Sequence, residues 1–253
     1  MIATRRLAKD ELLWSPALCA LGVVAGFTTK AQGSMAGSHH PLEEQAANRA
    51  ALARRLGFDE VVRVKQVHGR DIVRVESASQ AGVPVADGLW TDRDGILLGV
   101  AAADCVPILV ADPRGPVGGA HAGWQGTTLG VAGALVEAMV AGGATRERLV
   151  ASIGPSIGPC CYTIDEERAA VVAERIGDGA LRRDERGVSM DLWAANAAQL
   201  RAAGVARIEV TEICTRSGGA DLWSYRGRGA DGRYGTQLGF IGRPRSASEA
   251  SVR

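Results

Sequence analysis

Long apolar runs are missing from this chain of 253 residues. The longest, residues 17–27 and 96–103, fall well short of the roughly 18–20 apolar residues that a membrane-spanning helix needs. An excess of one charge is missing too, because 29 basic residues face 28 acidic ones. Such a balanced chain has no overall field that would attract nucleic acid or an anionic membrane. We therefore expect neither as a partner.

Cysteine is sparse, and its number is odd. Five cysteines in a chain of this length do not make the disulfide scaffold of a small secreted protein. Basic residues precede the apolar stretch that begins near Ala17, but Asp10 and Glu11 interrupt them and no A-x-A cleavage site follows. The sequence therefore predicts a reducing, cytoplasmic location.

Glycine, by contrast, is abundant, with 33 residues spread through the chain without a Gly-x-y period. This distribution excludes collagen and predicts tight turns. The hydrophobic fraction of 46% and the charged fraction of 23% are typical of a globular protein. Disorder over much of the chain is thereby excluded.

Helical and extended patterns are interspersed along the chain. Helices are predicted over residues 41–56, 128–140, 166–176 and 191–203, with Asp165 as an N-cap and glycines as stops. Extended segments are predicted within 17–27 and over 61–67, 72–75, 96–103, 107–111, 117–120, 150–153 and 207–210. We expect hairpins at Gly69-Arg70 and at Asp112–Gly115.

No steady βαβ alternation is present, so a doubly wound sheet is not favoured. We predict an α+β class, with a single layered α/β sandwich domain over residues 1–253 and mixed or antiparallel sheets. The tail from about residue 243, rich in Arg, Ser and Ala, is expected to fray.

Two of the four histidines lie at glycine-flanked strand ends, namely His68 and His121. Cys105 follows a buried strand in the same way. Two imidazoles and one thiolate make a three-ligand set for catalytic zinc, whose fourth position holds water. The same residues also fit a simpler interpretation, in which the cysteine is a small buried hydrophobe and the histidines cap carbonyl groups.

For the remaining histidines and the two adjacent cysteines we expect structural roles and no catalytic or metal-binding role. His39 and His40 lie between Ser38 and Pro41, where solvated loop residues are expected. Cys160 and Cys161 lie in a loop with two Gly-Pro steps, and adjacent cysteines rarely bridge. We expect them to shape the wall of a pocket.

Strand register decides whether Cys105 and His121 can share a site. If 107–111 and 117–120 pair as an antiparallel hairpin, the two side chains share a face only when the numbers of opposed residues add to an even number. A slip by one residue would point Cys105 away from His121.

Five motifs, in a fixed order, are specific to one protein family. In order they are Gln66-Val67-His68-Gly69; Ala86-Asp87-Gly88-Leu89; Ala103-Asp104-Cys105-Val106-Pro107; His121-Ala122-Gly123-Trp124-Gln125-Gly126-Thr127; and Ile153-Gly154-Pro155 with Cys160-Cys161-Tyr162. Ser224-Tyr225-Arg226 and Gly232-Arg233 add to them. In these motifs the chain resembles the laccase-domain family, also called the multicopper polyphenol oxidase or purine nucleoside phosphorylase family, which includes the peptidoglycan editing factor.

The resemblance implies a cysteine-hydrolase-like layered fold and a zinc-binding triad of His68, Cys105 and His121. It implies phosphorolysis of adenosine, inosine or methylthioadenosine, deamination of adenosine, or both, with a purine nucleoside and phosphate as partners. Bacterial relatives are also linked to the fidelity of cell-wall precursor synthesis.

Several other residues are candidates for this site. Asp104 can orient an imidazole or move a proton, and Trp124 can stack on a base or belong to the core. Gln66, Gln125 and Arg233 complete the expected substrate site, with Arg233 as an anion contact.

The chain departs from the family pattern in three places. Gln125 replaces a common arginine, Thr163 replaces a common glutamate, and the short segment 33–37 replaces a Ser-Leu-Asn-Leu-Gly segment. These departures bear on phosphate handling and on substrate choice, whereas the metal triad is intact.

Three other function classes use the same residues differently. In a laccase, one copper centre would consume His68, His121 and Cys105, and only two histidines would remain for a trinuclear cluster. Polyphenol oxidation is therefore disfavoured, although copper remains an alternative ion. A metal-free cysteine hydrolase would use Cys105 as nucleophile, His121 or His68 as base and Asp104 to orient the base. An enzyme that edits peptidoglycan precursors would use Cys105 and His121. A binding partner in cell-wall metabolism without turnover is the third class, and no residue pattern speaks for it.

Overall fold

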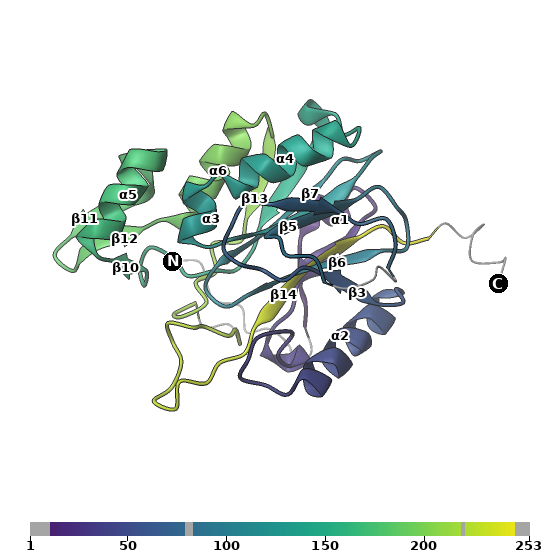
Figure 1. Cartoon of the computed structure of the whole chain (residues 1–253), viewed down its shortest axis with the longest axis horizontal. Helices are drawn as coiled ribbons and strands as arrows, with labels where there is room; N and C mark the ends of the chain where they lie inside the picture. The colour runs from purple at the N-terminus through teal and green to yellow at the C-terminus, as the bar shows by residue number, and fades with distance from the viewer. Residues whose placement is uncertain (1–10, 79–82, 219–220, 246–253) are drawn as a thin grey trace.

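The strands gather into three sheets, two with mixed pairing and one that is antiparallel (Figure 1). A computed structural model describes residues 11–78, 83–218 and 221–245. Within them, the first sheet runs β1 (Leu13–Trp14), β2 (Val24–Phe27), β14 (Gln237–Gly242), β6 (Leu97–Ala102), β3 (Val61–Arg63). The second runs β13 (Arg207–Val210), β9 (Val150–Ile153), β7 (Val106–Ala111), β8 (Val117–Ala122), β5 (Gly88–Thr91), β4 (Ile72–Arg74). The third is β10 (Thr163–Ile164), β12 (Gly187–Met190), β11 (Leu181–Asp184). Parallel pairs such as β3 with β6 occur beside antiparallel pairs such as β7 with β8, which confirms the α+β class with mixed sheets.

The two larger sheets pack against each other. Strands β6 and β14 of the first contact β7 and β8 of the second. Leu98 and Val100 of β6 share a buried cluster with Leu109 of β7. On its other face, β6 places Leu97 in a cluster with Leu52 of α2 (Leu42–Leu56). The strand is thus covered on both faces, as its continuous apolar run predicts.

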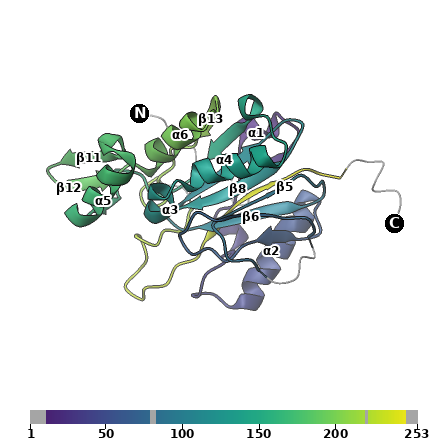
Figure 2. The same cartoon turned by 45° about the horizontal axis from the view of Figure 1, so that its top comes forward.

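Helices cover the outer faces of these sheets (Figure 2). Leu135 of α4 (Val131–Ala141) and Leu200 of α6 (Leu192–Ala202) share a cluster with Ile108 of β7. Helix α2 lies against the five-stranded sheet. Helix α5 (Glu166–Ile176) and the third sheet lie together to one side (Figure 1). Among the described residues, every helix is too short or too polar to cross a lipid bilayer.

Most helix ends follow the expected chemistry. The Asp165 side chain accepts a hydrogen bond from the Arg168 amide at 2.7 Å and begins α5. The Asp191 side chain does the same for the Ala194 amide at 3.0 Å and begins α6. Gly57 ends α2 in the left-handed conformation. The predicted cap at Asp165 and the predicted stop at Gly57 are confirmed, whereas Asp191 caps the helix that it was expected to begin.

Two segments differ from the predicted elements. Residues 128–140 are not a single helix, because Gly130 adopts a φ of 79° and separates α3 (Trp124–Thr128) from α4. Within 17–27, the expected strand is shorter, since Ser15 caps a helical turn, α1 (Pro16–Cys19), before β2 begins.

The hairpin predicted at Gly69-Arg70 is wrong. Strand β3 pairs with β6 in the first sheet and β4 pairs with β5 in the second, so the chain crosses from one sheet to the other. The physical reason is the Asp87 carboxylate, which accepts the backbone N–H groups of Val67, His68 and Gly69. These groups bind a side chain and not a returning strand.

The end of the chain also differs from expectation where it is described. The Arg243 guanidinium donates to the Gly115 carbonyl at 3.1 Å, so the predicted fraying does not begin at residue 243. Residues 246–253 of the predicted tail, and the basic residues before Asp10, lie outside the described part of the chain.

Candidate metal centre

His68, Cys105 and His121 converge. Their ligand atoms all lie within 4.8 Å of one another, and the Cys105 Sγ lies 3.9 Å from the His68 Nε2. The two imidazole rings stand nearly perpendicular, with centroids 4.9 Å apart. Ligand atoms around one tetrahedral zinc ion lie roughly 3.5–4 Å apart. The three atoms are thus within reach of a single ion.

The β7–β8 register brings two of these side chains together. Pro107 lies opposite His121, so the numbers of opposed residues add to an even number and odd-numbered residues of both strands share a face. Cys105 directly precedes β7 and continues that face. The register prediction is confirmed.

Close backbone approach completes the triad. His68 has a φ of 63°, a conformation that side chains other than glycine adopt at a cost. At Gly123 an added Cβ would lie 2.9 Å from the Cys105 Sγ and 3.0 Å from the His68 Cδ2. Only glycine leaves room there for both side chains.

Asp87 is the carboxylate that orders this site, although sequence reasoning assigned it no role. It is fully buried and accepts four hydrogen bonds: from the amides of Val67 (3.1 Å), His68 (2.9 Å) and Gly69 (2.7 Å) and from the His121 Nδ1 (3.0 Å). The bond from the His121 Nδ1 leaves the Nε2 free for an ion. A metal-bound histidine usually donates its other ring N–H to a carboxylate in this way. Burial raises the pKa of Asp87, but the His121 and backbone donors outweigh it and lower the value to about 2.

Cys105 and His121 form a charged pair without an ion. Burial opposes the charge on both, yet each stabilises the other, which lowers the pKa of the Cys105 thiol and raises the pKa of His121. Asp87 adds to the rise at His121. Both shifts favour the thiolate that a metal or a nucleophilic mechanism requires.

Asp104 does not orient an imidazole. Its carboxylate accepts hydrogen bonds from the Thr215 hydroxyl and from the Arg226 amide, both at 2.6 Å. The orienting role expected for Asp104 belongs to Asp87. Asp104 still lies beside the triad and lines the same cavity.

The triad opens into a cavity of about 730 Å³. Gln66, Trp124 and Gln125 line it, as expected of substrate-site residues. The Gln66 amide is already committed, since it donates to the Ala101 carbonyl at 2.8 Å and accepts from the Ala101 amide at 2.9 Å. The wall also includes Arg63, Lys65, Tyr162, Arg168, Tyr225, Arg226 and Tyr234.

Arg168 is a second residue that sequence reasoning missed. It belongs to α5, and its guanidinium lies 4.8 Å above the Trp124 ring, in the wall that also holds Gln125. The cation–π contact explains why one face of Trp124 is covered. No local sequence signal marks Arg168, because only tertiary packing brings α5 to the cavity.

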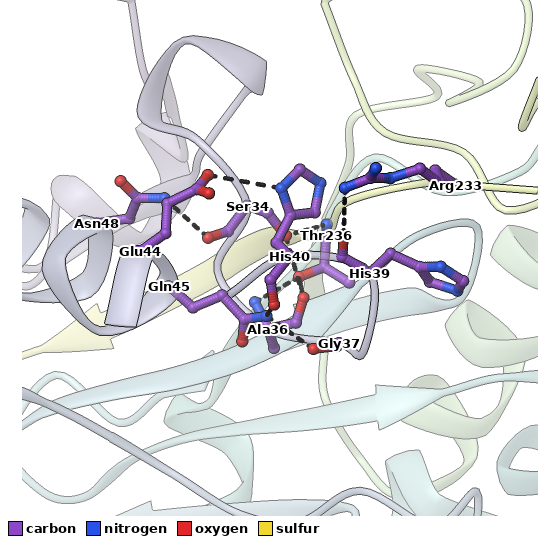
Figure 3. Close-up of polar contacts among 10 residues, drawn as sticks. All are labelled: Ser34, Ala36, Gly37, His39, His40, Glu44, Gln45, Asn48, Arg233 and Thr236. Carbon is purple, nitrogen blue, oxygen red and sulfur yellow. Dashed lines mark hydrogen bonds and ion pairs between the residues drawn. The ribbon is translucent and has the colours of Figure 1, made fainter. Parts of the chain in front are cut away.

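Arg233 lies outside this cavity, contrary to its predicted place in the substrate site. Its Nη2 donates to the His39 carbonyl at 3.2 Å (Figure 3), and its side chain lines a neighbouring cavity of about 500 Å³. That cavity also contains Lys30, Arg216 and Arg228. The hydrogen bond from Arg233 to the His39 carbonyl holds its side chain at this neighbouring cavity.

Hydrogen bonds hold segment 33–37, which replaces the usual Ser-Leu-Asn-Leu-Gly segment of the family (Figure 3). The Ala36 amide donates to the Thr236 hydroxyl at 2.8 Å, and the Gln45 amide group donates to the Gly37 carbonyl at 2.7 Å. Ala36 and Gly37 line the main cavity. This segment therefore shapes the entrance to the triad.

His39 and His40 lie in a loop, as expected, but are only partly exposed. His39 stacks at a tilt on Tyr234 with centroids 4.6 Å apart, and His40 packs edge-on against Trp223 and pairs with Glu44 at 3.5 Å. Both imidazoles are occupied away from the triad.

Comparison with known proteins identifies the family of this chain. Residues 25–244 match the family described as multi-copper polyphenol oxidoreductase laccase. A purine nucleoside phosphorylase of Deinococcus radiodurans is 41% identical over 89% of this chain and 91% of its own. A protein named adenosine deaminase, from an unknown prokaryotic organism, is 35% identical over 70% of this chain and 74% of its own.

A solved structure carries the same fold. The crystal structure of the hypothetical protein YfiH from Bacillus licheniformis superposes with a TM-score of 0.82 at 30% identity, covering 93% of this chain and 97% of that one. The family match over residues 25–244 includes every residue of the triad and of the surrounding cavity. The chain therefore belongs to the multi-copper polyphenol oxidoreductase laccase family.

Proposed function

We propose that this chain is a zinc-dependent enzyme that acts on purine nucleosides, by phosphorolysis of adenosine, inosine or methylthioadenosine, by deamination of adenosine, or by both. One observation carries the proposal: two imidazoles and a thiolate converge at a cavity large enough for a nucleoside. The names of relatives at 41% and 35% identity support this substrate class.

His68, Cys105 and His121 would hold the ion and take part in the reaction. Bound zinc would supply a polarised water or substrate atom at its open position. Asp87 keeps the proton on the His121 Nδ1 and so directs the Nε2 toward the site. Two nitrogens and one sulfur fit zinc, and they also fit copper as the less favoured ion.

The wall of the cavity supplies substrate contacts. Trp124, covered by Arg168 on one face, can present an edge or its other face to a base. Gln125 is neutral, whereas Arg168 brings a positive charge to the same wall over Trp124, and we assign Arg168 as the phosphate contact. Gln66 acts through Ala101 and so positions the wall. Asp104 stands beside the triad, where its carboxylate fixes Thr215 and Arg226.

The wider setting follows from the same proposal. The whole chain would form one domain, a layered sandwich of helix, sheet, sheet and helix. All five cysteines are free thiols, which supports a reducing cytoplasm. Polyphenol oxidation is disfavoured, because the two further histidines are engaged by Tyr234 and Trp223.

Metal analysis and turnover of Cys105→Ala test the proposal. Loss of the thiolate leaves two imidazoles, so zinc content, phosphorolysis and deamination should all be lost together. Cys19→Ala is the matched control, since Cys19 lies away from the triad and should leave all three unchanged. Turnover by Cys105→Ala protein that contains no metal would refute the mechanism.

A metal-free cysteine hydrolase is the second candidate. The charged Cys105–His121 pair with Asp87 behind it favours this mechanism, because it has the order of nucleophile, base and orienting carboxylate. Wild-type protein stripped of metal decides between the two. Full turnover without metal supports the hydrolase, whereas recovery only after zinc is restored supports the zinc enzyme.

A further inference from the structure

A second cluster of thiols lies outside the site described above. The sulfur atoms of Cys160, Cys161 and Cys214 all lie within 4.8 Å of one another, and those of Cys160 and Cys161 are 3.7 Å apart. The cluster shares no residue with the triad of His68, Cys105 and His121. Cys160 and Cys161, which were expected to shape the wall of a pocket, line neither of the two cavities described above. The third thiol comes from a distant part of the sequence.

The backbone around the cluster holds these thiols in place. The Ser156 amide donates to the Ile213 carbonyl at 3.2 Å and the Thr215 amide donates to the Ser156 carbonyl at 3.0 Å, so the two segments run side by side. Cys214 is 6% exposed, whereas Cys160 faces solvent. An ion can therefore enter past Cys160 and reach a sulfur that is already buried.

Polar groups contact the sulfur atoms of the cluster. The Gly158 amide donates to the Cys214 Sγ at 3.3 Å, and the Ser217 hydroxyl lies 3.3 Å from the Cys161 Sγ. The Arg186 guanidinium, which pairs with Asp184, donates to the Cys160 carbonyl at 3.2 Å and fixes the loop that carries two of the thiols.

The number and softness of the ligands select the ion. Structural zinc sites use four protein ligands, and in the described residues no fourth histidine, cysteine or carboxylate joins this cluster. Soft thiolates prefer monovalent copper, which accepts three sulfur ligands. We propose that Cys160, Cys161 and Cys214 form a second, sulfur-only site that binds one Cu(I) ion.

Binding replaces protons by the ion without any change of oxidation state. Each thiol that ligates releases its proton to solvent, and copper enters and stays as Cu(I). The ion would join residues 156–161 to residues 213–217. Thr215 of the second segment holds Asp104, and Ile157 of the first lines the main cavity, so the site would stiffen that wall.

Copper titration without oxygen tests the site in protein whose first site is silenced by Cys105→Ala. Cu(I) supplied from a competing chelator should bind at one equivalent per chain, with X-ray absorption showing sulfur neighbours only. Adding Cys160→Ser should abolish that equivalent; this residue is exposed, so its replacement should not disturb folding. Cys214→Ser should do the same, and Cys19→Ser is the matched control that should retain it.

Three results would overturn the assignment. They are failure of Cys105→Ala to bind Cu(I), binding that survives Cys160→Ser, and displacement of the copper by an excess of Zn²⁺. The readout is independent of catalysis, because Cys105→Ala already tests the zinc enzyme through its turnover. Loss of one proposal therefore leaves the other measurable.

Discussion

Replacement of Asp87 by asparagine is the most direct test of how the site is ordered. Each carboxylate oxygen accepts two hydrogen bonds: Oδ1 from the His68 amide and the His121 Nδ1, and Oδ2 from the Val67 and Gly69 amides. In Asp87→Asn, an NH₂ group takes the place of one oxygen, and two donors then face a donor. Asparagine can rotate its amide, but either orientation loses two bonds.

The cost can be estimated from these bonds. A hydrogen bond to a charged group contributes about 1.5–3 kcal/mol, so losing two lowers the free energy of unfolding by about 3–6 kcal/mol. For a chain of this size the lower figure corresponds to a fall in Tm of about 10 °C. Because His121 also loses its fixed tautomer, we expect zinc affinity to fall by about 10–100-fold.

The pH dependence of stability gives an independent check. The pKa of Asp87 is about 2 in the folded protein against an ordinary value of 3.8. Its stabilisation is therefore fully present above about pH 4 and is lost as the pH falls toward 2. The shift corresponds to about 2.5 kcal/mol. Asp87→Asn should lack this part of the acid dependence.

Thermal unfolding and competitive zinc titration provide the measurements, with Asp71→Asn as the control. Asp71 is exposed and close in sequence to the same loop, so its replacement should change neither quantity. Zinc affinity equal to that of the wild type in folded Asp87→Asn protein would refute the view that this carboxylate orders the triad.

Three further predictions concern the core, the triad and the cavity. Gly123→Ala should weaken zinc binding at least tenfold in titration, because its Cβ would press on Cys105 and His68. The control is Gly133→Ala in α4, whose Cβ meets nothing within 4 Å; it should leave zinc binding unchanged and raise the free energy of unfolding by about 0.5–1 kcal/mol. Equal zinc affinity in the two variants would contradict the steric argument. Asp112 is buried and accepts hydrogen bonds from Arg148 and from the Arg114 and Thr145 amides. Burial raises the pKa of Asp112 but these donors lower it overall, so the stabilisation is lost as the pH falls below 3.8. Denaturant unfolding of Asp112→Asn should therefore show a shallower acid dependence than the wild type, and parallel pH curves would contradict this role of Asp112. Arg168→Gln should raise the KM for phosphate by about 10–100-fold and Gln125→Arg should lower it, because charge-assisted hydrogen bonds to an oxyanion are about twice as strong as neutral ones. Arg175→Gln on the same helix is the control and should leave the KM unchanged. An unchanged KM in Arg168→Gln would remove Arg168 from the phosphate site.

The sequence predicts the elements of this fold better than their partners. Caps at Asp165 and Asp191 and the apolar run of β6 are local signals, and they mark the observed boundaries. The segment after β3 reads as a hairpin because glycine follows a β-branched run, yet a carboxylate 20 residues away captures its amides. Sequence spacing cannot reveal a bond of that kind.

The same distinction applies to the site. His68, Cys105 and His121 have residue types and strand-end positions that suggest a metal, and register joins two of them. Asp87 lies in one of the family motifs, but a carboxylate at a strand end looks the same whether it faces solvent or a histidine. Arg233 illustrates the opposite error, since a basic residue near a motif lies in a different cavity.

The position of β14 bears on how the chain folds during its synthesis. This strand comes after all the others in sequence, yet it lies between β2 and β6 in the middle of the five-stranded sheet. Until residues 237–242 have left the ribosome, β2 and β6 each expose an unpaired edge. Pairing over some 200 residues is slow, because the entropy of closing so long a loop is lost before any contact is made. We expect nascent chains of this protein to need protection from aggregation late in translation, even though most of their helices can form early.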